Sequence, residues 1–98
     1  MTTESDPHGV RAHLTGDLDC ATGDDLAGLV DQLLDAGHRR LVLDLTDLAF
    51  CDARGLTALL TADRTVHAMG GSLTVTGVPT QVGELLQMTG LGDAFGPR

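Results

Sequence analysis

The first half of the chain shows two spacings of apolar residues, one typical of a strand and one typical of a helix. Between residues 10 and 14 every second residue is apolar, which predicts a half-exposed strand at the edge of a sheet. Apolar residues then recur at helical spacing; they are Leu26, Leu29, Val30, Leu33 and Leu34. Thr22 with Asp25 resembles a capping box that starts this helix, and Gly37 ends it.

The second half repeats this alternation of strand and helix. The run from Leu41 to Leu45 is almost continuously apolar, so we expect it to be the central strand, with both faces of the sheet covered. A helix from Gly55 follows, with Asp63 on its solvent side. A third strand from Leu73 to Val78 precedes a last helix that starts at Pro79. Three further apolar residues are expected to close the end of the core: Met88, Leu91 and Phe95.

The elements alternate as strand, helix, strand, helix, strand, helix, joined by short connections. Each helix must then cross over the sheet and pack on it. The sequence predicts an α/β fold, with a small, mainly parallel or mixed sheet and crossover helices. Residues 1–9 are polar and acidic, and we expect them to form a flexible tail. Residues 10–98 are then one domain.

The charge of the chain restricts its partners. The formal net charge is -8, with six arginines and no lysine. A basic stripe for phosphate groups is therefore missing, so nucleic acid and anionic membranes are not expected as partners, and a basic protein surface is favoured. No apolar run reaches about 20 residues and the first residues are acidic, so neither a membrane span nor a secretory signal is expected. The sequence predicts a cytoplasmic protein.

Metal sites and catalytic sites are not indicated by the residue pattern. The four histidines lack the spacing of a zinc site, so no metal and no cofactor is expected. Cys20 and Cys51 are far apart in sequence and are expected to be free thiols. Cys51 precedes a helix start, where a thiolate would be stabilised, so a small thiol or phosphoryl-transfer enzyme is one alternative. We favour a packing role for Cys51, because no histidine or second cysteine stands near it in the sequence.

The loop at residues 49–55 is the strongest candidate for a site. It joins the end of the expected central strand to the start of the second long helix. Backbone N–H groups at a helix start are electropositive and bind anions or a capping carboxylate. Asp52 is placed to be that cap, and a contact of the same residue with a partner stays open beside this role.

Three stretches resemble the STAS domain family, small modules found in bacterial anti-sigma factor antagonists and in the cytosolic tails of anion transporters. The first, Leu14 to Asp19, is similar to the family's L-x-G-[ED]-L-D turn. The second, Leu43 to Leu56, resembles D-L-x-x-[VL]-x-F-x-D-S-[ST]-G-[LI]. The third, Met69 to Leu73 with Leu91 near the end, is similar to the G-G-x-L-x-[VL] strand and the terminal x-G-L. The resemblance covers about residues 10–95.

This resemblance implies a regulatory function without catalysis. Family antagonists bind an anti-sigma factor of the GHKL kinase type, which phosphorylates the serine right after the motif aspartate and so breaks the complex. The aspartate corresponds to Asp52, but the serine position is Ala53 and the next hydroxyl position is Arg54. Neither side chain can accept phosphate, so the usual switch is not expected here.

The resemblance also implies a partner-binding surface on this chain. Its residues are Asp19, Asp52, Ala53, Arg54, Gly55 and Thr57. Arg54 places a positive charge at a helix start, where it is disfavoured, so its side chain either contacts a partner or is simply solvated. We predict a protein-binding regulator of sigma-factor-dependent transcription. A scaffold subunit of a larger signalling assembly of STAS domains is the other alternative.

The chain is shorter than the resemblance implies. Family antagonists usually have an additional strand before the one at Val10 and a further strand or helix after Leu91. The sheet is therefore expected to lack one or two strands, and an incomplete sheet leaves self-association open.

Overall fold

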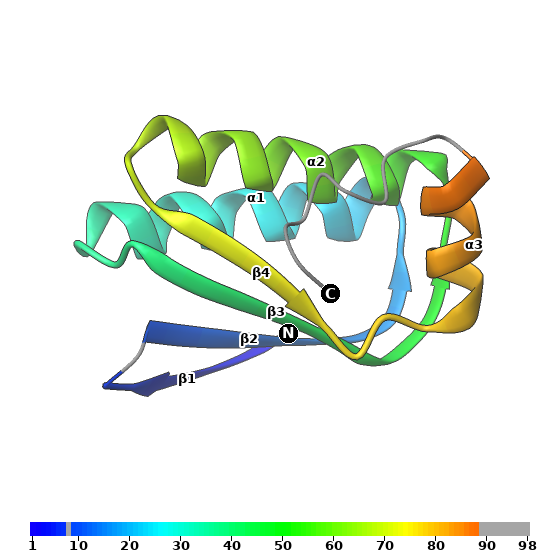
Figure 1. Cartoon of the computed structure of the whole chain (residues 1–98), viewed down its shortest axis with the longest axis horizontal. Coiled ribbons are helices and arrows are strands. Elements are labelled where there is room, and N and C mark those ends of the chain that lie inside the picture. The colour runs from blue at the N-terminus through cyan, green and yellow to red at the C-terminus, as the bar shows by residue number, and fades with distance from the viewer. Residues whose placement is uncertain (8, 89–98) are drawn as a thin grey trace.

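The computed structural model describes residues 1–7 and 9–88 of the chain and shows a sheet with helices packed on it (Figure 1). The elements are β1 (Thr2–Asp6), β2 (Gly9–Leu18), α1 (Cys20–Asp35), β3 (Arg40–Cys51), α2 (Ala53–Ala68), β4 (Ser72–Thr76) and α3 (Thr80–Met88). The predicted α/β class is confirmed. No helix within the described ranges is both long enough and apolar enough to cross a membrane.

The four strands lie in the sheet in chain order, β1-β2-β3-β4. β1 pairs antiparallel with β2, whereas the pairs β2/β3 and β3/β4 are parallel. Both parallel connections move across the sheet in the same direction, and such crossovers are right-handed. Helices α1 and α2 therefore lie side by side on the same face of the sheet, as Figure 1 shows. On the other face Arg11 of β2 is exposed and Val42 of β3 is partly exposed, and no described helix is packed along these two strands there; we call it the open face.

The core lies between the sheet and the two long helices. Its deepest side chains are Leu14, Leu18, Leu26, Leu43, Leu45, Leu59, Val30 and Val66. The central position of β3 is confirmed, because it pairs on both sides. The expectation that both of its faces are covered is wrong: Leu41, Leu43 and Leu45 are buried, but Val42 and Asp44 between them are partly exposed.

Residues 2–6 form a strand where the composition predicts a tail, and this prediction is wrong. β1 pairs with β2 from Thr2 opposite His13 to Asp6 opposite Gly9. As a result, β2 is an internal strand and not the predicted edge strand. An edge strand can form through backbone hydrogen bonds alone, without burying its side chains, and composition cannot detect such a strand. The additional strand before Val10 is thus present.

Helix α1 starts three residues before the predicted position. Asp19 is its N-cap and Thr22 is the third helical residue, so the capping box joins Asp19 and Thr22 instead of Thr22 and Asp25. The helix ends as predicted, with Gly37 just beyond it at a φ of 96°. Only a glycine adopts this left-handed conformation without a steric cost.

Two further predictions differ from the structure in detail. Asp63 is 9% exposed and therefore does not face solvent. Its Oδ1 atom is 3.2 Å from Nε2 of His67, one turn later on α2. β4 ends at Thr76, so Val78 lies beyond the strand. Leu91 and Phe95 lie outside the described residues, as does the side chain of Met88.

Candidate functional site at the paired helix starts

The starts of α1 and α2 lie next to each other because they follow neighbouring parallel strands. Parallel strands end at the same edge of a sheet, so β2 and β3 deliver their helices to one place. The backbone N–H of Asp52 donates to the carbonyl oxygen of Leu18 at 3.3 Å. A Cβ atom on Gly55 would overlap that same carbonyl oxygen, so only glycine fits at this position. We call residues 19–23 and 52–57 the paired helix starts.

Asp19 caps the start of α1 with its carboxylate. Its Oδ1 accepts a hydrogen bond from the Thr22 backbone N–H at 3.1 Å, and the Thr22 hydroxyl accepts one from the Asp19 N–H at 2.8 Å. The hydrogen bond from the Thr22 backbone N–H, and to a smaller extent the one with the Thr22 side chain, lower the pKa of the Asp19 carboxyl from its ordinary value of 3.8. The carboxylate is therefore ionised and oriented by the helix that it caps.

Asp52 caps α2, as the sequence predicts. Its Oδ1 accepts a hydrogen bond from the Gly55 backbone N–H at 2.8 Å. The capped helix then presents Ala53 and Arg54 to solvent in its first turn. Thr57 is also exposed, but its hydroxyl donates to the Ala53 carbonyl oxygen at 2.9 Å. The nearest hydroxyl to the motif aspartate on α2 is thus already held by the backbone.

An exposed aromatic residue, whose exposure is not predicted by the sequence pattern, borders the paired helix starts. Phe50 lies two residues before the Asp52 cap, pairs in register with Asp17 of β2, and is 51% exposed. A large apolar side chain in this position is available to a partner without unfolding the core. Its sequence signal is weak, because Phe50 stands in an apolar stretch that reads equally well as a buried strand end.

The Cys51 thiol is poorly suited to act as a nucleophile. Burial, and then the negative charge of Asp52, raise its pKa to about 11. Its Sγ lies 3.5 Å from the Asp52 carbonyl oxygen, to which it donates. A thiol with this pKa is almost fully protonated near neutral pH, and the thiolate is the reactive form. The packing interpretation of Cys51 is therefore favoured over the enzymatic one.

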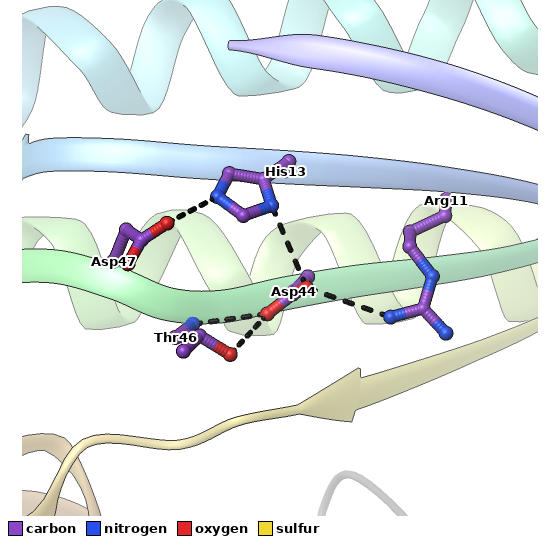
Figure 2. A network of polar contacts seen from close by, with 5 residues as sticks. All are labelled: Arg11, His13, Asp44, Thr46 and Asp47. Carbon is purple, nitrogen blue, oxygen red and sulfur yellow. Dashed lines mark hydrogen bonds and ion pairs between the residues drawn. The ribbon is translucent and has the colours of Figure 1, made fainter.

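A separate polar network lies on the open face of the sheet and joins β2 to β3 (Figure 2). Asp44 accepts hydrogen bonds from the hydroxyl and backbone N–H of Thr46 at 2.6 and 3.0 Å, and these bonds lower the pKa of its carboxyl. The other oxygen of Asp44 is 3.5 Å from both Arg11 and His13, and the second ring nitrogen of His13 is 2.8 Å from Asp47. Within residues 1–7 and 9–88, no three metal-ligating side chains converge.

A family model described as "Mlab, STAS domain" matches residues 1–96. The chain belongs to the STAS domain family. Regulation without catalysis is general in this family, and the match extends to the β1 residues, which supports their place in the domain.

Solved STAS-like structures show the same fold. A proposed anti-sigma factor antagonist from Thermotoga maritima has a TM-score of 0.82 at 18% identity, over 92% of this chain and 78% of that one. The anti-sigma factor antagonist SpoIIAA, in its unphosphorylated form, has a TM-score of 0.71 at 18% identity, over 89% and 81%. A sulfate transporter family protein from Wolinella succinogenes has a TM-score of 0.76 at 22% identity, over 88% and 70%. At such identities the similarity establishes the fold alone.

The six partner-binding residues predicted from the STAS resemblance all lie in the paired helix starts. Two of them, Asp19 and Asp52, are engaged as caps, and Gly55 is buried against β2. The other three are exposed on α2: Ala53, Arg54 and Thr57. The contact of this STAS domain with a partner remains a prediction.

Proposed function

We propose that this STAS domain is an anti-sigma factor antagonist that binds its regulatory partner through the paired helix starts and Phe50. SpoIIAA, which shares the fold, is an anti-sigma factor antagonist and has been solved with and without phosphate. The chain presents a solvent-exposed first turn of α2 beside an exposed aromatic ring, and such a surface is available for protein contact.

The observation that carries this proposal is the exposed position of Ala53. It directly follows the Asp52 cap, where a hydroxyl would be free to react, and it offers a methyl group instead. An antagonist without an acceptor at this position stays in its binding state. Control would then come from synthesis, degradation or competition between partners.

The kinase activity of the partner is the second part of the proposal. An anti-sigma factor of the GHKL type would dock on this surface but find no hydroxyl on Ala53 or Arg54. A phosphate placed at residue 53 would meet the backbone N–H groups of the helix start and the Arg54 guanidinium, both of which stabilise phosphate. The environment therefore suits a phosphorylated residue even though the acceptor is missing.

Incubation with ATP and candidate anti-sigma factor kinases tests the proposal. We expect the wild type to bind such a factor without stoichiometric phosphorylation at residues 53–57, and Ala53→Ser to become phosphorylated. Mass spectrometry locates the phosphate, and calorimetry measures the dissociation constant. Complete phosphorylation of Thr57 in the wild type, or failure of the wild type to bind any anti-sigma factor, would contradict the proposal.

A further inference from the structure

A groove of about 300 Å³ runs along the surface between the N-terminal halves of α1 and α2. Three small residues form its floor, Gly23 and Ala27 from α1 and Ala58 from α2. Gly23 lets the helices approach closely, because a Cβ atom there would lie only 2.9 Å from the Ala58 Cβ. Ala27 is exposed and Ala58 is partly exposed, so the floor offers methyl groups to solvent.

Two exposed side chains of opposite charge line the groove on opposite walls. They are Asp24 on α1 and Arg54 on α2. Gly23 faces Ala58 across the groove, Asp24 follows Gly23 by one residue, and Arg54 precedes Ala58 by four residues. Four residues make about one helical turn. Arg54 and Asp24 therefore stand about one turn apart along the groove.

Neither charged side chain forms an ion pair with another residue in the described part of the molecule. Among the ion pairs between described residues, none includes Asp24 or Arg54, although the chain pairs other carboxylates with Arg11, His13 and His67. A positive charge at a helix start is disfavoured by the helix dipole. An acidic group of a partner placed beside Arg54 would remove this cost, and a basic group one turn further would pair with Asp24.

We propose that this groove binds an amphipathic helix of the protein partner. The small residues of the floor allow a third helix to pack closely against α1 and α2, as in other helix-in-groove complexes. The bound helix presents aliphatic side chains to the floor, an acidic side chain to Arg54 and, one turn away, a basic side chain to Asp24. This inference rests on the proposed function, since Arg54 belongs both to the groove and to the paired helix starts.

Two variants, each with one alanine replaced by arginine, test whether the anti-sigma factor that binds the wild type uses the groove. Ala27→Arg fills the floor, whereas Ala68→Arg adds the same side chain at an exposed position at the far end of α2. We expect the dissociation constant to rise at least about tenfold for Ala27→Arg and less than about twofold for Ala68→Arg. Circular dichroism and thermal melting check that both variants are folded.

The outcomes separate this inference from the proposed function. If the anti-sigma factor binds the wild type and Ala27→Arg binds equally well while Arg54→Ala binds more weakly, the groove is overturned and the function stands. If no anti-sigma factor binds the wild type, both are overturned. An equal loss of affinity for Ala27→Arg and Ala68→Arg also overturns the proposal that the groove binds the partner. The loss would then come from the added positive charge and not from its position in the groove.

Thr61 allows a second readout, because it is exposed, lines the groove and lies outside the paired helix starts. In the Cys20→Ser background, we expect bound anti-sigma factor to slow alkylation of a thiol introduced by Thr61→Cys at least about tenfold, and to leave a thiol introduced by Ala68→Cys at its free rate. Cys51, with a pKa of about 11, contributes little to the signal. Protection of the Thr61→Cys thiol in concentrated protein without partner would assign the groove to a second copy of the chain and overturn the proposal.

Discussion

Asp52 combines a structural role with a position at the proposed interface, and the two roles can be measured separately. Asp52→Ala removes the acceptor of the Gly55 N–H bond, so we expect a loss of about 1 kcal/mol in the free energy of unfolding. Urea denaturation measures this loss, and calorimetry measures the binding of an anti-sigma factor. Asp35→Ala, at an exposed position of α1 far from the cap, is the control. Equal binding by the two variants would place the interface elsewhere.

The reactivity of Cys51 distinguishes a packed thiol from a catalytic one. A pKa of about 11, against an ordinary value of 9.0, lowers the thiolate fraction near neutral pH about a hundredfold relative to an ordinary thiol. We therefore expect iodoacetamide to modify Cys51 in the Cys20→Ser variant at least about tenfold more slowly than after unfolding in urea. Rapid modification of Cys51 in the folded variant at neutral pH would revive the thiol-enzyme alternative.

At the scale of single residues, the sequence identified the helix cap at Asp52 and the missing phosphate acceptor at Ala53. It did not show which side chains are exposed and which are buried. Asp52, Ala53 and Gly55 could be assigned because the motif fixes their spacing. The exposure of Phe50 and the burial of Asp63 could not, because both depend on which neighbouring element covers that position. Helical spacing gives the faces of a helix but not the width of the face that its neighbours bury.

The polar network between β2 and β3 makes the stability of the sheet depend on acid pH. The pKa of Asp44 is lowered in the folded protein, mainly by the Thr46 hydroxyl and backbone bonds, so the folded state holds its proton less tightly than the unfolded chain. The resulting stability is present above the unfolded value near 3.8 and is lost as the pH falls through the lower folded value. The contribution of Asp44 to the free energy of unfolding is therefore lost in the acid range, from a pH of about 4 downward.

We expect Asp44→Asn to flatten this acid dependence. Between pH 6 and pH 3 the urea midpoint of the wild type should fall more steeply than that of Asp44→Asn. Asp35→Asn, which alters a carboxylate outside the network, should follow the wild type. Parallel curves for the wild type and Asp44→Asn would show that the network contributes nothing through the charge of Asp44.

At the scale of elements, the spacing of apolar residues located all three helices and three of the four strands in the described part of the chain. β1 was missed because its side chains are exposed and its stabilisation comes from backbone pairing with β2. The open face of β3 was missed because Val42 continues the apolar run of Leu41 and Leu43, although it points away from the helices. A run of apolar residues shows that a strand is central, but the number of covered faces depends on the direction of the crossovers.

The oligomeric state of the whole molecule distinguishes a monomeric antagonist from a scaffold subunit. The chain has a mass of 10.2 kDa. An antagonist that exchanges between partners is expected to be monomeric when free, whereas a scaffold subunit would assemble without any kinase. Sedimentation velocity at micromolar concentration should give a single species near the mass of one chain. A dominant larger species would favour the scaffold alternative and the self-association that the sequence leaves open.

The agreement between strand order and chain order has a consequence for synthesis on the ribosome. Because the sheet runs β1-β2-β3-β4, no described strand must be inserted between two strands that have already paired. Each new strand can add to one growing edge, and β3 and β4 each follow a helix that can already cover the apolar face. We expect ribosome-bound chains of increasing length to gain protease protection strand by strand. Protection that begins only once β4 has emerged would instead indicate that the four strands fold together as one unit.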